Sequence, residues 1–240
     1  MNPIIFSLTF SGTALLVFLL FKWFDKRLLL GFGLLFAIYI GLDDLVTGLP
    51  SASKAFQLMS AGEWNWSGKI YSLVLSALVI LALGIKTKTI GLTFTQKKLK
   101  VCLIALGLFI LWGAFLGRMF SPEAPSAETL AFQGLMPGLS EEMVYRGIGP
   151  AILLGLIRGK DHPDGIPWTV VFITSIMFGI WHGLSYSDAK FSFEPLAALF
   201  PFIGSIAGGW LRFKSGSLIF PILGHCAANV AFHLSPMIGS

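Results

Sequence analysis

The most informative residues in this sequence are polar side chains that lie within long apolar runs. They form three groups, which are Glu141, Glu142 and Arg146; His182; and His225 with Asn229. Hydrolysis of a peptide bond needs a base that deprotonates water and donors that bind the developing oxyanion. A carboxylate can act as the base, and histidine or asparagine can act as donors. These residue types therefore suit hydrolytic chemistry if the fold brings them together.

The first group has helical spacing. Glu142 and Arg146 are four residues apart, so on a helix they share a face and can form an ion pair. Glu141 lies about 100° round the helix and is expected to lack that partner, which would leave its carboxylate available as a proton acceptor. The alternative is that both acids only complement the positive start of a helix after Pro137 and Gly138. That alternative explains one acid, but not an arginine one turn deeper in an apolar run.

The other polar residues are less informative one by one. His182 ends an apolar run and, taken alone, could be a structural histidine. His225 and Asn229 share a helical face, which is also compatible with polar contacts between packed helices. Asp43 and Asp44 are near the end of another apolar run, where contact with solvent at an acidic helix terminus would explain them.

The composition indicates that these apolar runs lie in a lipid membrane. Of 240 residues, 55% are hydrophobic and 12% are charged, against about 25% charged in ordinary soluble domains. A spanning helix needs about 20 apolar residues. The sequence therefore predicts an all-α, polytopic transmembrane helical bundle with about eight spanning helices. The predicted ranges are 3–21, 28–49, 67–85, 99–118, 137–157, 167–185, 194–211 and 217–235.

We expect a single membrane domain over residues 1–240. Residues 1–136 hold four N-terminal spans and interfacial loops, and residues 137–235 hold the catalytic spans with the three polar groups. The first run is expected to be a retained helix, because no basic segment precedes it. Trp64 and Trp66 are typical of interfacial anchors, and the loop 119–136 is expected to contain a short interfacial helix beside the site.

Consecutive spans alternate in direction, and this places the polar groups at similar depth. The glutamates are in the first turns of the fifth span, and His182 is in the last turns of the sixth. The eighth span places His225 midway and Asn229 one turn beyond it. All of them are therefore expected in one half of the bilayer.

The distribution of basic residues predicts the orientation. One set of connections carries Lys22, Lys26, Arg27, Lys86, Lys88, Lys97, Lys98, Lys100, Arg158, Lys160, Arg212 and Lys214, and the opposite set carries Lys54, Lys69, Arg118 and Lys190. The positive-inside rule then places both termini outside the cytoplasm, with the site nearer the external face. The net charge of +5 thus reflects topology, and no nucleic-acid partner is expected. The two cysteines show no metal-ligand spacing, and no disulfide is expected.

Together the three groups resemble the CAAX-protease and bacteriocin-processing family, also called Abi or type II CAAX prenyl endopeptidases. The matching motifs are Glu141-Glu142-x-x-x-Arg146, Phe178-x-x-x-His182 and His225-x-x-x-Asn229, in the order the family has them. The resemblance covers residues 137–235. It implies a glutamic intramembrane endopeptidase with no metal or other cofactor.

The resemblance also implies a role for each residue. Glu141, helped by His182, activates a water that attacks a peptide carbonyl. His225 and Asn229 stabilise the oxyanion, and Glu142 and Arg146 order the site. The expected partners are the lipid bilayer and a membrane-associated protein or peptide, prenylated or carrying a sorting tag. The expected protein is a monomer in a prokaryotic inner membrane.

Several alternatives remain open on the sequence alone. Glu141, His182 and His225 could form a zinc site, although the HExxH spacing is absent. A nucleophilic Cys226 or Ser140 is less consistent with helical geometry and with the missing GxSxG motif. A transporter or proton relay would also place acids and histidines inside a membrane. A bacteriocin-immunity protein could keep the motifs without peptidase activity.

Overall fold

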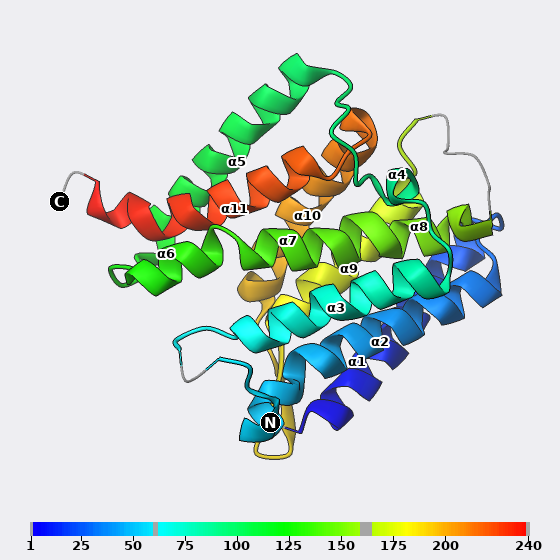
Figure 1. Cartoon of the computed structure of the whole chain (residues 1–240), viewed down its shortest axis with the longest axis horizontal. Coiled ribbons are helices and arrows are strands. Elements are labelled where there is room, and N and C mark those ends of the chain that lie inside the picture. Colours follow the sequence, from blue (N-terminus) through cyan, green and yellow to red (C-terminus); the bar gives the residue numbers. More distant parts are fainter. Residues whose placement is uncertain (1, 60–61, 159–164, 239–240) are drawn as a thin grey trace.

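The computed structural model describes residues 2–59, 62–158 and 165–238, and Lys160 of the predicted basic connections lies outside them. The chain is a bundle of helices (Figure 1). Seven of the predicted ranges coincide with single helices: α1 (Pro3–Phe24), α2 (Leu30–Ala52), α3 (Trp66–Ala82), α5 (Leu99–Phe120), α9 (Trp168–Gly183), α10 (Pro195–Ser215) and α11 (Ile219–Leu234). The short elements are α4 (Thr87–Ile90), α6 (Ala127–Gln133), η1 (Lys54–Phe56), η3 (Leu156–Arg158) and η4 (Ser235–Met237).

The remaining predicted span, 137–157, is a helix of changing pitch. It consists of α7 (Met136–Glu142), a π-helical segment η2 (Met143–Ile148) and α8 (Gly149–Leu153). Pro150 has no N–H and cannot continue an α-helical ladder back to the carbonyl of Arg146. The π segment ends just before this proline, with the Gly149 N–H bonded to the Val144 carbonyl.

Helix length and hydropathy test the predicted number of spanning helices. Within the described residues, four helices are long and apolar enough to cross a membrane, namely α1, α2, α5 and α10. Two more, α3 and α9, are apolar but shorter. The predominantly helical membrane architecture is thus confirmed, and the count of eight stays a prediction.

The π-containing helix lies between two groups of helices (Figure 1). On one side α1 packs against α2, and α2 packs against α3 and α8. On the other side α5 packs against α11, and α10 packs against α9. The main apolar core joins α1, α2, α8 and α9 around Phe10, Phe18, Phe36, Ile148 and Ile173.

A β-hairpin follows α9, and the sequence did not predict it. Strands β1 (Leu184–Ser187) and β2 (Lys190–Phe193) pair antiparallel. The turn residues Asp188 and Ala189 both have positive φ, at 49° and 58°, as the tightest hairpin turns require. The predicted sixth span, which extended to residue 185, therefore ends earlier, at Gly183.

Hydrogen bonds show that the connections gather at two ends of the bundle. At one end the Lys97 N–H donates to the Ser215 carbonyl at 2.8 Å, and Thr169 Oγ1 donates to Asp25 Oδ2 at 3.0 Å. This end holds the basic connections, in agreement with the predicted alternation. At the other end Ser126 Oγ donates to Glu63 Oε2 at 2.7 Å.

Arg212 differs from its predicted place in a connection. Helix α10 runs on to Ser215, so Arg212 lies within it and is 3% exposed. Its guanidinium donates to the carbonyls of Ile90 and Thr89 at 3.3 and 3.1 Å. It therefore satisfies the carboxyl end of α4 and is not a free charge of the basic face.

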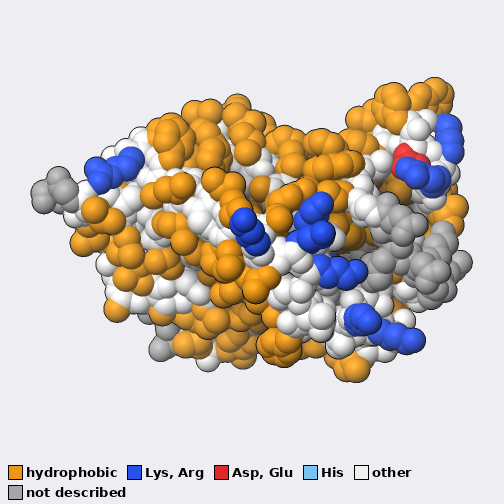
Figure 2. Space-filling view, turned by 90° about the horizontal axis from the view of Figure 1, so that it is seen from above, with side chains coloured by type: hydrophobic (Ala, Val, Ile, Leu, Met, Phe, Trp, Pro, Cys, Tyr) orange, Lys and Arg blue, Asp and Glu red, His pale blue; other side chains and the backbone are white. Residues whose placement is uncertain are grey.

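The surface agrees with a lipid environment. Figure 2 shows hydrophobic side chains spread over much of one face, with Lys and Arg in a few separate groups. Leu8, Leu20 and Leu81 are 69%, 61% and 76% exposed. Continuous apolar surface of this extent is unusual for a protein dissolved in water.

Candidate active site

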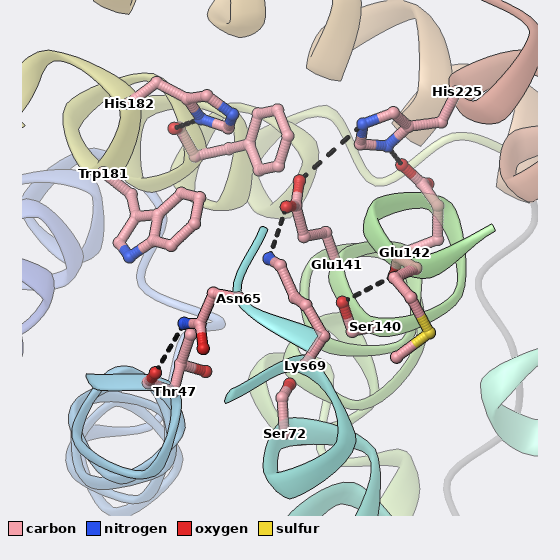
Figure 3. Close-up of polar contacts among 12 residues, drawn as sticks. Thr47, Asn65, Lys69, Ser72, Ser140, Glu141, Glu142, Trp181, His182 and His225 are labelled. Atoms are coloured by element: carbon pink, nitrogen blue, oxygen red, sulfur yellow. Dashed lines mark hydrogen bonds and ion pairs between the residues drawn. The ribbon is translucent and has the colours of Figure 1, made fainter. Parts of the chain in front are cut away.

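The predicted site residues converge between α7, α9 and α11. Glu141 and Glu142 end α7, His182 lies in the last turn of α9, and His225 lies midway along α11. Figure 3 shows both histidines on the same side of the two glutamates. The structure therefore brings these groups together, and their depth in the bilayer stays a prediction.

Glu142 is the most buried charged residue of the site, at 1% exposure. Its Oε1 lies 3.0 Å from Arg146 Nη1, which confirms the predicted ion pair. The same oxygen lies 2.8 Å from His225 Nδ1. An ionised carboxylate can only accept, so Nδ1 carries the proton, and the opposite nitrogen Nε2 turns toward Glu141.

Glu141 is not paired with Arg146, as predicted, but it has another cation that the sequence did not predict. Lys69 Nζ lies 2.6 Å from Glu141 Oε1, and both side chains are buried. The other oxygen, Oε2, is also buried and has no hydrogen-bond partner among the described residues. It lies 3.7 Å from His225 Nε2. Glu141 thus has one paired oxygen and one acceptor left open toward the site.

His182 is oriented by its own helix. Its Nδ1 lies 2.8 Å from the Phe178 carbonyl oxygen. Because a carbonyl only accepts, Nδ1 carries the proton and Nε2 is the basic nitrogen of the neutral ring. The Phe178 ring also packs against His182, with centroids 4.4 Å apart. The motif Phe178-x-x-x-His182 therefore fixes both the orientation and the tautomer of the imidazole.

Asn229 faces the site from one turn beyond His225, but its amide is partly engaged. Its Nδ2 donates to Gln133 Oε1 at 2.8 Å. Gln133 is the last residue of α6, the short helix expected in loop 119–136. One amide hydrogen of Asn229 is used in this contact, and the second remains for a ligand.

Close helix packing brings α11 to the glutamates. A Cβ on Gly138 would lie 2.3 Å from Cys226 Sγ and 2.9 Å from the Ile222 carbonyl oxygen. Only glycine allows α7 and α11 to approach this closely. The residue next to Cys226 is His225, so the absence of a side chain at Gly138 helps to set the His225–Glu142 contact.

Two cavities meet at the site. The first, of about 210 Å³, is mostly apolar and lies among α5, α10 and α11, with Glu142 and Arg146 in its wall. The second, of about 520 Å³, is more polar and contains Lys69 and Glu141 in its wall. Both are lined by His182, His225, Asn229 and Phe232. We call the first the apolar chamber. We call the second the polar chamber, because its wall carries more polar side chains, although aromatic side chains also line it.

The structure does not support a zinc ligand set. In the part of the chain that the structure describes, no three His, Cys, Asp or Glu side chains are arranged to hold a metal ion. Glu141 is instead bound to a lysine, and His225 Nδ1 is bound to Glu142.

Residues outside the predicted set also belong to the site. Asp44 is buried rather than solvent-exposed, and its oxygens accept from Trp181 Nε1 at 2.9 Å and Ser7 Oγ at 2.5 Å. Asp43 accepts from Ser72 Oγ at 2.6 Å. The expectation of an acidic helix terminus in solvent is therefore wrong, because α2 continues to Ala52.

Lys69 lies in α3 and is buried, so its predicted place in a connection is wrong. Its position inside the predicted span 67–85 is the signal that could have identified it, because a charge within an apolar span is costly. The two tryptophans make contacts that the sequence did not predict. Trp64 Nε1 and Trp66 Nε1 donate to Thr129 and Glu128 of α6 at 3.0 and 3.1 Å. They fasten α6 beside the site, in addition to any anchoring at the interface.

The comparison with protein families agrees with this site. The model described as type II CAAX prenyl endopeptidase Rce1-like matches residues 124–231. This segment is Rce1-like. The Rce1-like segment contains all six predicted site residues, and the family is one of membrane-associated proteases. No curated protein and no solved structure matches the chain.

The Rce1-like segment does not supply the whole site. It starts at residue 124, whereas Lys69 and Asp44 come from α3 and α2, which precede it. The N-terminal helices therefore contribute polar side chains to the site as well as packing.

Proposed function

We propose that this chain is an intramembrane endopeptidase that hydrolyses a peptide bond of a membrane-associated protein or peptide, using a water activated by Glu141. The observation that carries the proposal is the open oxygen of Glu141. A buried carboxylate oxygen without a partner is costly unless something binds there. Glu141 Oε2 is such an atom, and its residue lies in the wall of the polar chamber.

The proposed reaction uses this oxygen as the base. A water donates a hydrogen bond to Glu141 Oε2 and is oriented by His182 Nε2. Its oxygen attacks the carbonyl carbon of the scissile bond while its proton passes to Glu141. That proton later goes to the leaving amine as the C–N bond breaks. Atoms and charges balance without a metal ion or another cofactor.

The developing oxyanion needs donors on the opposite side of the carbonyl. The second amide hydrogen of Asn229 supplies one, and His225 is proposed to supply the other. Glu142 supports this role because its carboxylate holds His225 at Nδ1 and is itself paired with Arg146. Glu142 and Arg146 are therefore proposed as positioning residues.

The chambers support a membrane-associated substrate. The apolar chamber would hold an apolar side chain or a lipid attached to the substrate, and the polar chamber would supply water. The family description points to a prenylated substrate, and a sorting-tagged peptide would satisfy the same chambers. The charge distribution favours an orientation with the site toward the external face. We propose a monomer in a prokaryotic inner membrane.

The proposal is tested by cleavage assays on purified protein in detergent. The wild type and Glu141→Gln are incubated with fluorogenic peptides, with and without farnesyl-cysteine, and with and without a chelator. We expect Glu141→Gln to lower the rate by about 10²- to 10⁴-fold, the usual contribution of a general base. Glu123→Gln, at an exposed position in the loop before α6, is the matched control and should keep the wild-type rate.

Two outcomes would contradict the proposal. Full activity of Glu141→Gln would remove this residue as the base. Cleavage abolished by chelator would favour a metal enzyme, despite the arrangement of the side chains.

A further inference from the structure

Among the described residues, Lys69 is the one buried cation at the proposed site that neither the sequence motifs nor the matched family segment includes. It is 7% exposed and lies in the first turn of α3. A cation is disfavoured there, because the N-terminus of a helix carries partial positive charge. A buried ion pair is also weak evidence for stability, since removing charges from water costs about as much as the pair returns. Helix stability therefore does not explain this lysine.

The contact with Lys69 makes the two oxygens of Glu141 different from each other. Oε1 accepts from Lys69 Nζ at 2.6 Å, a length typical of a charge-assisted hydrogen bond. Oε2 has no hydrogen-bond partner among the described residues and lies 3.7 Å from His225 Nε2. Without such a contact a carboxylate can rotate about its last bond and exchange its oxygens. With it, one oxygen is held and the other is presented to the site.

Lys69 itself is positioned by a tryptophan. Figure 3 shows Lys69 reaching toward Glu141, with Trp181 to one side. The Lys69 ammonium lies 4.8 Å from the Trp181 ring centroid, within the range of a cation–π interaction. Trp181 directly precedes His182, so the same turn of α9 holds the cation and carries the proposed catalytic histidine.

Asp44 fixes the tryptophan in turn. Trp181 Nε1 donates to Asp44 Oδ1 at 2.9 Å, and Ser7 Oγ donates to Asp44 Oδ2 at 2.5 Å. The indole therefore cannot rotate without breaking a partly buried hydrogen bond to the Asp44 carboxylate. The chain of contacts from Ser7 to Glu141 crosses α1, α2, α9, α3 and α7.

We propose that Lys69, held by Trp181 and Asp44, is a positioning residue that reserves Glu141 Oε2 for the attacking water. This inference rests on the proposed function, because it assigns a role within that reaction. It predicts that loss of Lys69 slows the chemical step and leaves substrate binding nearly unchanged, since substrate binding uses the chambers and the chemical step uses Oε2.

The test compares kcat and KM of Lys69→Met, Lys69→Arg and Lys69→Cys with the wild type on a peptide that the wild type cleaves. We expect Lys69→Met to lower kcat by about 100-fold, as for a misplaced catalytic group, with KM changed less than about threefold. Lys69→Arg should retain more activity than Lys69→Met, because it keeps the charge. Treating Lys69→Cys with 2-bromoethylamine creates a lysine analogue and should restore activity.

Three controls separate positioning from folding. Lys190→Met removes an exposed lysine of the hairpin and should leave kcat unchanged. Wild type treated with 2-bromoethylamine reports any effect on Cys102 and Cys226. Trp181→Phe keeps an aromatic ring but loses the donor to Asp44, and it should lower kcat by a smaller factor than Lys69→Met.

The outcomes distinguish the two proposals. If the wild type cleaves peptides and Lys69→Met does so with the same kcat, the role of Lys69 is refuted and Glu141 remains the proposed base. A loss of activity that the amine reagent does not restore, in protein that stays folded, also refutes positioning by the ammonium group. If folded wild type cleaves no peptide in the library, the proposed function fails, and the inference fails with it.

Discussion

Gly113 of α5 lies in close contact with α11 beside the site, and substituting it should disturb the site from outside. A Cβ at Gly113 would lie 2.0 Å from the Ala228 carbonyl oxygen of α11, whereas ordinary contacts begin near 3.4 Å. In Gly113→Ala, the two helices must therefore separate by about 1.4 Å at this point. Ala228 lies between His225 and Asn229 in α11, so both side chains move with it.

This movement of α11 would lengthen the contact between His225 and Glu142. His225 Nδ1 lies 2.8 Å from Glu142 Oε1. If α11 moves away by the full amount, this distance becomes about 4.2 Å, which is too long for a hydrogen bond. We expect a loss of about 1–3 kcal/mol in the free energy of unfolding, as for other overpacked contacts. We also expect peptide cleavage to fall by about 100-fold.

The matched control is Gly107→Ala in the same helix. A Cβ at Gly107 has no atom within 4 Å. Alanine is also the better helix former, by about 1 kcal/mol. Unfolding in detergent and cleavage of a fluorogenic peptide are measured for both variants. Gly107→Ala should equal or exceed the stability of the wild type and keep its activity. Equal stability and equal cleavage rates for the two variants would refute the close contact between α5 and α11.

Two further predictions concern buried and exposed ion pairs. Arg146→Met leaves Glu142 buried without its cation and should cost about 3–5 kcal/mol in unfolding free energy; adding Glu142→Gln should recover part of this, and strictly additive losses would contradict the pairing. Asp25 lies outside the spanning helices, and its hydrogen bond from Arg27 lowers its pKa to about 2. This contact stabilises the fold above the unfolded pKa near 4 and is lost as the pH falls toward 2, so Asp25→Asn should flatten the dependence of unfolding temperature on pH between these values. An unchanged pH dependence in Asp25→Asn would show that other acids control it.

Much of the fold follows from local sequence patterns. Apolar runs bordered by Lys, Pro and Gly predict helices because each helix satisfies its own backbone in lipid. The ion pair between Glu142 and Arg146 was predicted correctly, because two residues four positions apart meet on one helical turn. The alternation of spans also predicts that His182 and His225 lie near the glutamates.

The predictions that failed depend on contacts between distant segments. Lys69 and Glu141 are 72 positions apart, and Asp44 and Trp181 are 137 apart. A period of 3.6 residues says which residues share a face of one helix, but not which face of another helix meets it. The hairpin after α9 was missed because β1 begins at the end of an apolar run and each strand has only four residues, too few for the alternation of polar and apolar residues to stand out.

The sequence by itself determined that this is a helical membrane protein and which acids and histidines could do chemistry, because hydropathy and helical spacing are properties of neighbouring residues. Only the tertiary structure decided how those groups are paired. In the folded chain Glu141 pairs with Lys69, Glu142 contacts His225, and Glu141 Oε2 has no hydrogen-bond partner among the described residues. These residues lie on α3, α7 and α11, and only packing brings those helices together.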